Sequence, residues 1–357
     1  MLSNPAHQEF HLVRAIIRGR AGMAKDLAGT PYFDWSAFLR YVDAQTLGSC
    51  IFHTAQSHSL MSMLPREVVE SLRRSFLTQV RWNSLLLARV AELDAAFRRS
   101  GREVIFLKGL CLAQEYFGQI AARQVGDIDL LIKDHRDISE IEAILGSLGY
   151  RRRSRILGSR TLMSRYTHHM EFDGPLAPLD LHWVLRQHPS FRLDYSEIWQ
   201  RKRQMQVRNV HLLALSVEHE LVLQFLSIHN DLQLGVIRLK SFVDLYAILR
   251  QVAETMAWEE FFARRAGEGL LRMSVNVLDL TLDIIDCRSE FEALVDAIGE
   301  HRSVVVLRDV HAKLELFPGT SGALRRRTWA LRLYETSPLH ALWWWGVSLP
   351  FRLAEHR

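Results

Sequence analysis

Hydrophobic periodicity changes twice along this chain, and the two changes limit the folds that it can adopt. From Glu9 to about Arg99, apolar residues recur at spacings of three and four, which is typical of amphipathic helices. Between Val104 and Trp183, short apolar and β-branched runs alternate with helical stretches. After about Val207 the helical spacing returns. The sequence therefore predicts a small mixed sheet between two helical segments.

The middle of the chain holds the strand candidates. They are short runs separated by helical stretches, at 104–107, 128–132, 150–156, 165–172 and 178–184. This alternation favours an α+β fold, with helices on one face of the sheet. We expect three parts packed as one body: an N-terminal helical region at 1–100, an α/β core at 101–206 and a C-terminal helical region at 207–357.

Composition sets broad limits on the class of protein. The 357 residues suffice for two or three cores of ~100–200 residues each. The net charge of +5 favours anions, but it is too small to be diagnostic of nucleic-acid binding. Cys50, Cys111 and Cys287 lie far apart without metal-ligand spacing, which indicates a reducing compartment and argues against a structural zinc site. No secretion signal follows Met1, so we expect a cytoplasmic protein.

The most apolar segment is LWWWGVSLPFRL, from Leu342 to Leu353. It is too short to span a bilayer, which needs about 20 apolar residues, so no transmembrane segment is expected. Its consecutive tryptophans suit peripheral contact with a membrane interface. Packing on the protein's own core or on a partner is the favoured interpretation.

Two aspartates accompany the second strand candidate, in the stretch DIDLLI. Residues two apart in a strand share one face, so Asp127 and Asp129 would lie side by side. Like charges this close raise each other's proton affinity unless a cation lies between them. Mg²⁺, or Mn²⁺ in its place, binds one or two carboxylates together with phosphate oxygens. The alternative is a strand end at which both acids simply reach solvent.

The surrounding residues favour a metal-phosphate site. Lys108 and Gly109 close the preceding strand and open a helix, whose first N–H groups can hold an anion. Gly109 lets the backbone approach a phosphate, and Lys108 adds a positive charge. Arg123 is a further candidate phosphate partner, and Asp180, in PLDLHWV, supplies a third acid.

Three histidines lie in the last two strand candidates. His182 shares a face with Asp180, where it can contact a bound phosphate, orient an acceptor or support a neighbour by hydrogen bonding. In YTHHMEFD, either His168 or His169 must face the side of the site, and Glu171 shares the face of His169. For His169 the favoured interpretation is a histidine satisfied within the sheet.

In combination, these motifs resemble the nucleotidyltransferase superfamily. LKG, a helix with a tyrosine, an arginine, DIDLLI and DLHW follow one another as in a bacterial branch known as uncharacterised nucleotidyltransferase family proteins. The flanks agree with that branch through two tryptophans and a later histidine and aspartate, at Trp35, Trp82, His229 and Asp244. The resemblance implies a nucleotidyltransferase-like core and spans most of the chain.

The resemblance also implies a reaction. In such enzymes a nucleoside monophosphate passes from an NTP to an acceptor with the help of divalent metal ions. By position, Asp127 and Asp129 would be the metal pair, and Asp180 the third metal ligand and base-like residue. One departure concerns the donor: the superfamily has Gly-Gly or Gly-Ser where this chain has Lys108-Gly109, so Lys108 would replace the missing hydroxyl.

The acceptor stays open at this stage. A small molecule, a carbohydrate or a peptide is favoured. A tRNA acceptor, as in toxins of the superfamily, is an alternative suggested by the arginine runs at 151–153 and 325–327. Aromatic residues typical of RNA platforms are absent from the first run, so nucleic acid is not the favoured partner. A catalytically inactive scaffold protein is the remaining alternative.

Overall fold

The architecture is taken from a computed structural model, which describes residues 8–153, 167–186, 188–307, 323–335 and 346. The N-terminal part is helical, as the spacing predicted. Short helices pack against one another and against one long helix, in the order α1 (Gln8–Ile17), α2 (Ala21–Ala28), α3 (Trp35–Ala44), α4 (Gly48–Ser57), the 3-10 turn η2 (Met61–Met63) and α5 (Arg66–Arg99).

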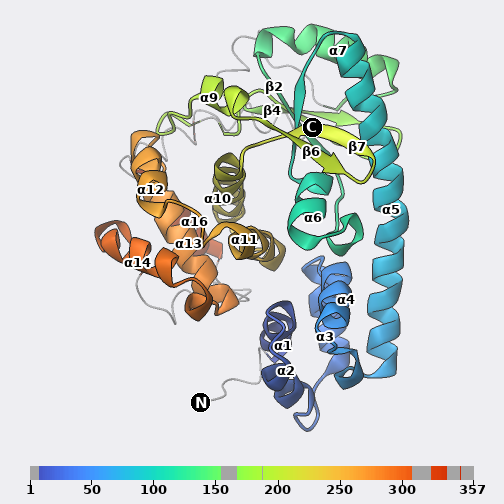
Figure 1. The fold of residues 1–357 in the computed structure, drawn as a ribbon, viewed down its shortest axis with the longest axis vertical. Helices are drawn as coiled ribbons and strands as arrows, with labels where there is room; N and C mark the ends of the chain where they lie inside the picture. Colours follow the sequence, from blue (N-terminus) through green and yellow to red (C-terminus); the bar gives the residue numbers. More distant parts are fainter. Residues whose placement is uncertain (1–7, 154–166, 187, 308–322, 336–345, 347–357) are drawn as a thin grey trace.

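Helix α5 connects the N-terminal helices to the sheet and runs along one side of the whole molecule (Figure 1). It begins directly after Pro65, a residue suited to helix starts. In its second half, one apolar stripe is buried against the sheet layer, through Leu86, Val90, Leu93 and Phe97. Burial of this stripe fixes α5 to the core, as expected for an amphipathic surface helix.

The central sheet is mixed and has five strands in the order β1-β2-β5-β4-β3. Their bounds are β1 (Val104–Leu107), β2 (Ile128–Ile132), β3 (Arg151–Arg152), β4 (His169–Asp173) and β5 (Leu179–His182). Strands β2 and β5 are parallel, whereas the other neighbouring pairs are antiparallel. Each of the five predicted strands has a counterpart in this sheet, and the α+β fold class is confirmed. The predicted strand positions 154–156 and 165–166 lie outside the described residues.

The connections within the sheet region are helical. They are α6 (Gly109–Phe117), η3 (Ile120–Ala122), η4 (His135–Asp137) and α7 (Ile138–Ser147). Strand β1 is buried on both faces: Phe106 joins the core shared with α5 and α7, whereas Ile105 and Leu107 join the larger core that contains the N-terminal and C-terminal helices. The prediction of helices on one face only is wrong here, because side chains of the second face are also buried, in this larger helical core.

A hairpin of β6 (Arg203–Val207) and β7 (Val210–Ala214) follows the helix α9 (Tyr195–Gln200). Its second strand lies where the sequence predicted the return of helices. The turn contains only Arg208 and Asn209, and Arg208 has φ of 53°. Because this turn lacks the glycine that usually marks two-residue hairpins, its sequence signal is weak.

The remaining helices form the C-terminal part, with α10 buried around nearly all of its circumference. They are α10 (Val217–Leu234), α11 (Leu239–Val252), α12 (Trp258–Gly267), α13 (Leu271–Ile285), η5 (Arg288–Glu290), α14 (Glu292–Glu300), η6 (Arg302–Val304) and α16 (Ala323–Arg332). Among the described residues, no helix has the length and apolar character needed to cross a bilayer. Apart from Gly346, the tryptophan-rich segment at 342–353 lies outside the described residues.

Candidate active site

The turn from β1 into α6 has an unusual backbone. Lys108 has φ of 47° and ψ of −130°, and Gly109 follows with φ of 52°. A Cβ on Gly109 would lie 3.6 Å from Val125 Cγ1, which is an ordinary contact, so backbone conformation and not space favours glycine here. A lysine at positive φ costs conformational energy, and such strain is often found at functional sites.

The side chain of Lys108 reaches across to the C-terminal helices. Its Nζ donates a hydrogen bond to Ser227 Oγ on α10. Lys108 directly precedes the first turn of α6, so the helix N-terminus and a basic residue occur together at this turn. This turn has the features of an anion-binding site.

Two acids face each other across the parallel strands. Asp129 of β2 is the register partner of Asp180 of β5. Asp127 lies one residue before β2, outside the strand in which it was predicted, and lines the same cleft as Asp129. The structure therefore brings the three predicted acids to one end of the β2–β5 pair.

His182 joins two of these acids in a compact group of possible metal ligands. Its Nε2 lies 3.2 Å from Asp129 Oδ1. Asp129, Asp180 and His182 each offer one ligand atom, and these atoms lie within 4.8 Å of one another. Within the described part of the chain, Asp127 does not belong to a group this compact, so it stands at the rim of the site.

The acids influence one another's protonation. Burial, followed by the negative charge of Asp129, raises the pKa of Asp180 to about 7. The same two causes raise the pKa of Asp127. Burial also disfavours the charge of Asp129, but the hydrogen bond to His182 and nearby positive charges outweigh it and lower the pKa of Asp129. The site thus concentrates negative charge that a cation would stabilise.

A cleft of about 480 Å³ opens beside these acids. Its sheet side includes the turn at Lys108 and Gly109, and its other wall comes from α10, α11 and the loop after α3. The lining is largely polar, with Gln224, Ser227, Asn230, Asp231, Arg238, Lys240, Ser241 and Asp244 on the helical side. A charged, hydrogen-bonding ligand suits such walls better than an apolar one.

Comparison with known proteins identifies the family. The profile of a family described as "Uncharacterised nucleotidyltransferase" matches residues 31–285, well over half of the chain. The chain belongs to this family. The resemblance of the LKG, DIDLLI and DLHW motifs is confirmed, and the protein is a nucleotidyltransferase by class.

Two further comparisons add context. A solution structure of the antibiotic-resistance factor ANT(2'')-Ia is similar, with a TM-score of 0.38 and 13% identity. That match covers 61% of this chain and 99% of the other. No protein in a search of curated proteins matches this nucleotidyltransferase.

Arg123, the candidate phosphate partner, is already paired with a carboxylate in the fold. It is buried, and its Nε and Nη2 each donate to a carboxylate oxygen of Asp244 at 2.8 Å. This bidentate pair joins the segment before β2 to α11 beneath the cleft of the nucleotidyltransferase. Arg123 also lines the cleft, so its role as a phosphate partner stays a prediction.

Lys240 is a cleft residue that sequence reasoning missed. It lines the cleft from α11, and burial, followed by the charge of Arg123, lowers its pKa to about 8. Its only sequence signal was its position one helical turn before Asp244. Ser227 of α10 was missed for the same reason, because helical spacing alone does not show which face meets the sheet.

Proposed function

We propose that this nucleotidyltransferase uses Mg²⁺ or Mn²⁺ to transfer a nucleoside monophosphate from an NTP to an acceptor group on a small molecule, a carbohydrate or a peptide. The observation that carries the proposal is the pairing of Asp129 with Asp180 across parallel strands, with Asp127 on the same cleft. The anion-binding features of the Lys108 turn, beside these acids, support the same reaction class.

The residues fit a hard divalent cation. Asp127, Asp129 and Asp180 offer carboxylate oxygens, which Mg²⁺ and Mn²⁺ prefer. The raised pKa of Asp180, caused by burial and by the charge of Asp129, indicates charge repulsion that a cation would relieve. A bound metal ion would supply charge neutralisation for the phosphates and a lower pKa for an attacking hydroxyl.

The side chains around the metal would divide the remaining work. Asp127, Asp129 and Asp180 would hold the ion, and an oxygen of Asp180 would accept the proton of the attacking group. His182 would orient Asp129 through the contact between Nε2 and Oδ1. Each of these roles follows from the position of the group at one end of the β2–β5 pair.

The triphosphate would bind between the α6 turn and the helical wall. Lys108 and the first N–H groups of α6 would contact phosphate oxygens, with Gly109 giving close access. Lys240 would add a second positive charge from the opposite wall. In the in-line step, the acceptor group would form a bond to the α-phosphorus as the bond to the departing pyrophosphate breaks, and these groups would supply positioning and charge stabilisation.

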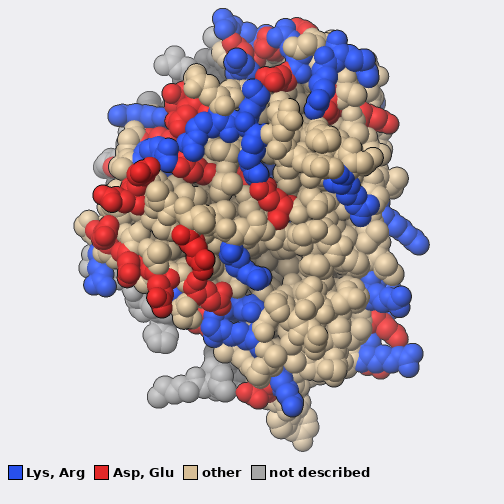
Figure 2. Space-filling model, in the orientation of Figure 1, with Lys and Arg blue, Asp and Glu red and all other residues tan. Residues whose placement is uncertain are grey.

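The surface supports a small acceptor over a nucleic acid. Figure 2 shows basic and acidic side chains interspersed on one face instead of a continuous basic surface. Arg153 pairs with Glu171 and Asp173, which offsets part of the charge of the first arginine run. In the second run, Arg326 and Arg327 donate to the carbonyl oxygens of Gly235 and Leu234 at the end of α10.

The test is nucleotidyl transfer by the purified full chain. Each α-labelled NTP is incubated with Mg²⁺ or Mn²⁺ and a pool of cell metabolites and peptides, and label in new products is measured. We expect labelled product with at least one NTP, and its loss in Asp127→Asn and Asp129→Asn. Asp26→Asn, at an exposed position of α2, is the matched control and should keep activity. Absence of transfer with every NTP contradicts the proposal.

A further inference from the structure

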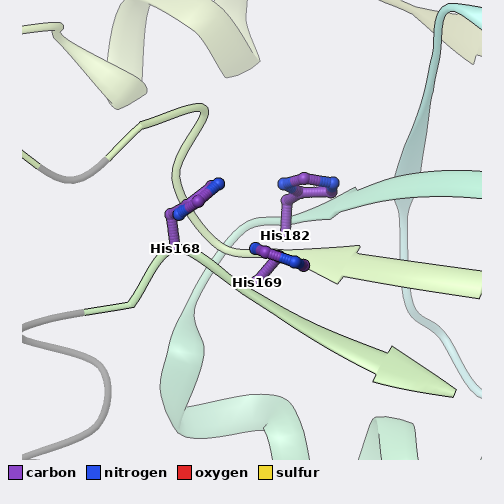
Figure 3. Close-up of side chains that lie close together, drawn as sticks. All are labelled: His168, His169 and His182. Atoms are coloured by element: carbon purple, nitrogen blue, oxygen red, sulfur yellow. The ribbon is translucent and has the colours of Figure 1, made fainter. Parts of the chain in front are cut away.

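Three histidine side chains gather next to the carboxylates. His168 lies just before β4, His169 begins β4 and His182 ends β5 (Figure 3). The ring centroids are 4.4 Å apart for His168 and His169, 5.1 Å for His169 and His182, and 5.8 Å for His168 and His182. The cluster is therefore compact, although its members come from two strands.

The backbone fixes this arrangement. His169 is the register partner of His182 in the antiparallel ladder between β4 and β5. The N–H of Trp183 donates to the carbonyl oxygen of His168 at 3.2 Å, which holds His168 against the end of β5. Neither contact depends on a side-chain rotamer, so the three rings stay neighbours when the rings themselves turn.

Carboxylates accompany two of the rings. His182 Nε2 lies 3.2 Å from Asp129 Oδ1, and His169 Nε2 lies 3.9 Å from Glu171 Oε1. In metal sites, a ligating histidine commonly gives its other ring N–H to a carboxylate, which fixes the tautomer. His182 Nδ1 is buried and has no hydrogen-bond partner within the described part of the chain. That nitrogen is available as a ligand.

We propose that His168, His169 and His182 bind a nitrogen-preferring divalent transition-metal ion, of which Zn²⁺ is the representative. One nitrogen from each ring lies within 4.8 Å of the others. Tetrahedral zinc with Zn–N bonds of about 2.0–2.1 Å requires nitrogens roughly 3.4 Å apart, so small side-chain rotations complete the site. Three imidazoles leave a fourth position for water or another ligand.

This site differs in chemistry from the carboxylate site beside it. Imidazole nitrogens suit Zn²⁺, Co²⁺ and Ni²⁺, whereas Mg²⁺ selects oxygen ligands. The cysteine spacing that argued against zinc in the sequence does not bear on histidines from two strands. An ion on His182 Nδ1 places the ring proton on Nε2, toward Asp129, so the ion at this site would hold that carboxylate in position.

Metal binding by the full chain tests the proposal. The protein is prepared without a histidine tag and is made metal-free. Its Zn²⁺ binding is measured by calorimetric titration in the presence of excess Mg²⁺. In a second titration, Co²⁺ is added and visible absorption is recorded. We expect one Zn²⁺ per chain and the intense visible bands of four-coordinate Co²⁺. His168→Ala and His169→Ala should each weaken Zn²⁺ binding by about 10-fold or more. His211→Ala, at an exposed position of β7, should leave it unchanged.

The outcomes separate this proposal from the nucleotidyltransferase reaction. Equal Zn²⁺ affinity in the wild type and in the double variant His168→Ala/His169→Ala overturns it, as does a Zn²⁺ site that disappears only in Asp127→Asn. His168→Gln, which keeps a polar side chain, repeats the test if alanine prevents folding. Transfer with Mg²⁺ is measured on the same samples, so loss of the zinc site leaves the transferase result interpretable by itself.

Discussion

Asp129 and Asp180 are direct neighbours in the parallel ladder between β2 and β5, although 51 positions separate them in the chain. Ligand atoms of Asp129, Asp180 and His182 lie within 4.8 Å of one another, and Asp129 also lines the cleft that contains the Lys108 turn. Parallel pairing brings the acids together without a sequence motif that contains both. The site therefore depends on the register of these two strands.

Removing one charge of the pair should change the protonation of the other. In Asp129→Asn, we expect the pKa of Asp180 to fall below its value of about 7, because the charge of Asp129 is the second cause of that value. Burial, the first cause, remains, so the pKa should stay above the ordinary 3.8. Carboxyl NMR titration measures it. An unchanged pKa would show that the two carboxylates do not interact.

The same group should make stability depend on pH. A carboxyl whose folded-state pKa is raised favours the folded state while it is protonated, and it loses that contribution as pH rises between 3.8 and about 7. Asp180→Asn should therefore be more stable than the wild type at about pH 8, by on the order of 1–3 kcal/mol, and nearly equal at about pH 4. Urea unfolding in a chelator measures the difference.

Added metal provides the control for that experiment. Saturating Mg²⁺ should stabilise the wild type at about pH 8 and narrow its difference from Asp180→Asn, because a bound cation relieves the repulsion. In the matched control Asp26→Asn, the free energy of unfolding should change with pH and with Mg²⁺ as it does in the wild type. If Asp180→Asn is less stable than the wild type at about pH 8, the raised pKa of Asp180 does not destabilise the folded protein at that pH, and the prediction is wrong.

Local sequence rules gave more information about the strand side of the site than about its helical side. A strand has a side-chain period of two, so the spacing of Asp127 and Asp129, and of Asp180 and His182, could be interpreted before any pairing was known. The helical wall was not predictable in this way. Lys240 and Ser227 line the cleft because of the way α10 and α11 are placed in the fold. Helical periodicity identifies the apolar face of a helix, but it does not show which residues of that helix lie near a distant strand.

Arg123 shows that the sequence around a residue does not reveal its partner in the fold. Its position four residues before Asp127 suggested a phosphate partner, but its buried pair with Asp244 depends on a helix that begins more than a hundred residues later. The β6–β7 hairpin was missed because the turn at Arg208 has no glycine. In both cases the missing information was tertiary: a partner across the fold or a backbone angle held by packing.

The pair of Arg123 and Asp244 should be costly to break from one side. We expect Arg123→Met or Asp244→Leu alone to reduce the free energy of unfolding by about 3–5 kcal/mol, because each leaves an unpaired buried charge. The double variant should recover most of this loss, as urea unfolding can measure. If NTP affinity is also normal in the double variant, Arg123 is structural; a loss of NTP affinity confined to variants lacking Arg123 would restore its phosphate role.

Lys240 should make nucleotide binding sensitive to alkaline pH. Burial, followed by the charge of Arg123, lowers its pKa to about 8, so the side chain loses its positive charge as pH rises through that value. We expect NTP affinity in the wild type to weaken above about pH 8. Lys240→Met should bind NTP about 10-fold more weakly at about pH 7, a loss of roughly 1.4 kcal/mol, and its affinity should no longer fall near pH 8.

Lys25→Met, at an exposed position of α2, is the matched control and should reproduce the wild-type dependence of NTP affinity on pH. Because loss of the ammonium group is the proposed cause, a variant without it that kept the wild-type pH dependence would assign that dependence to another group in the cleft.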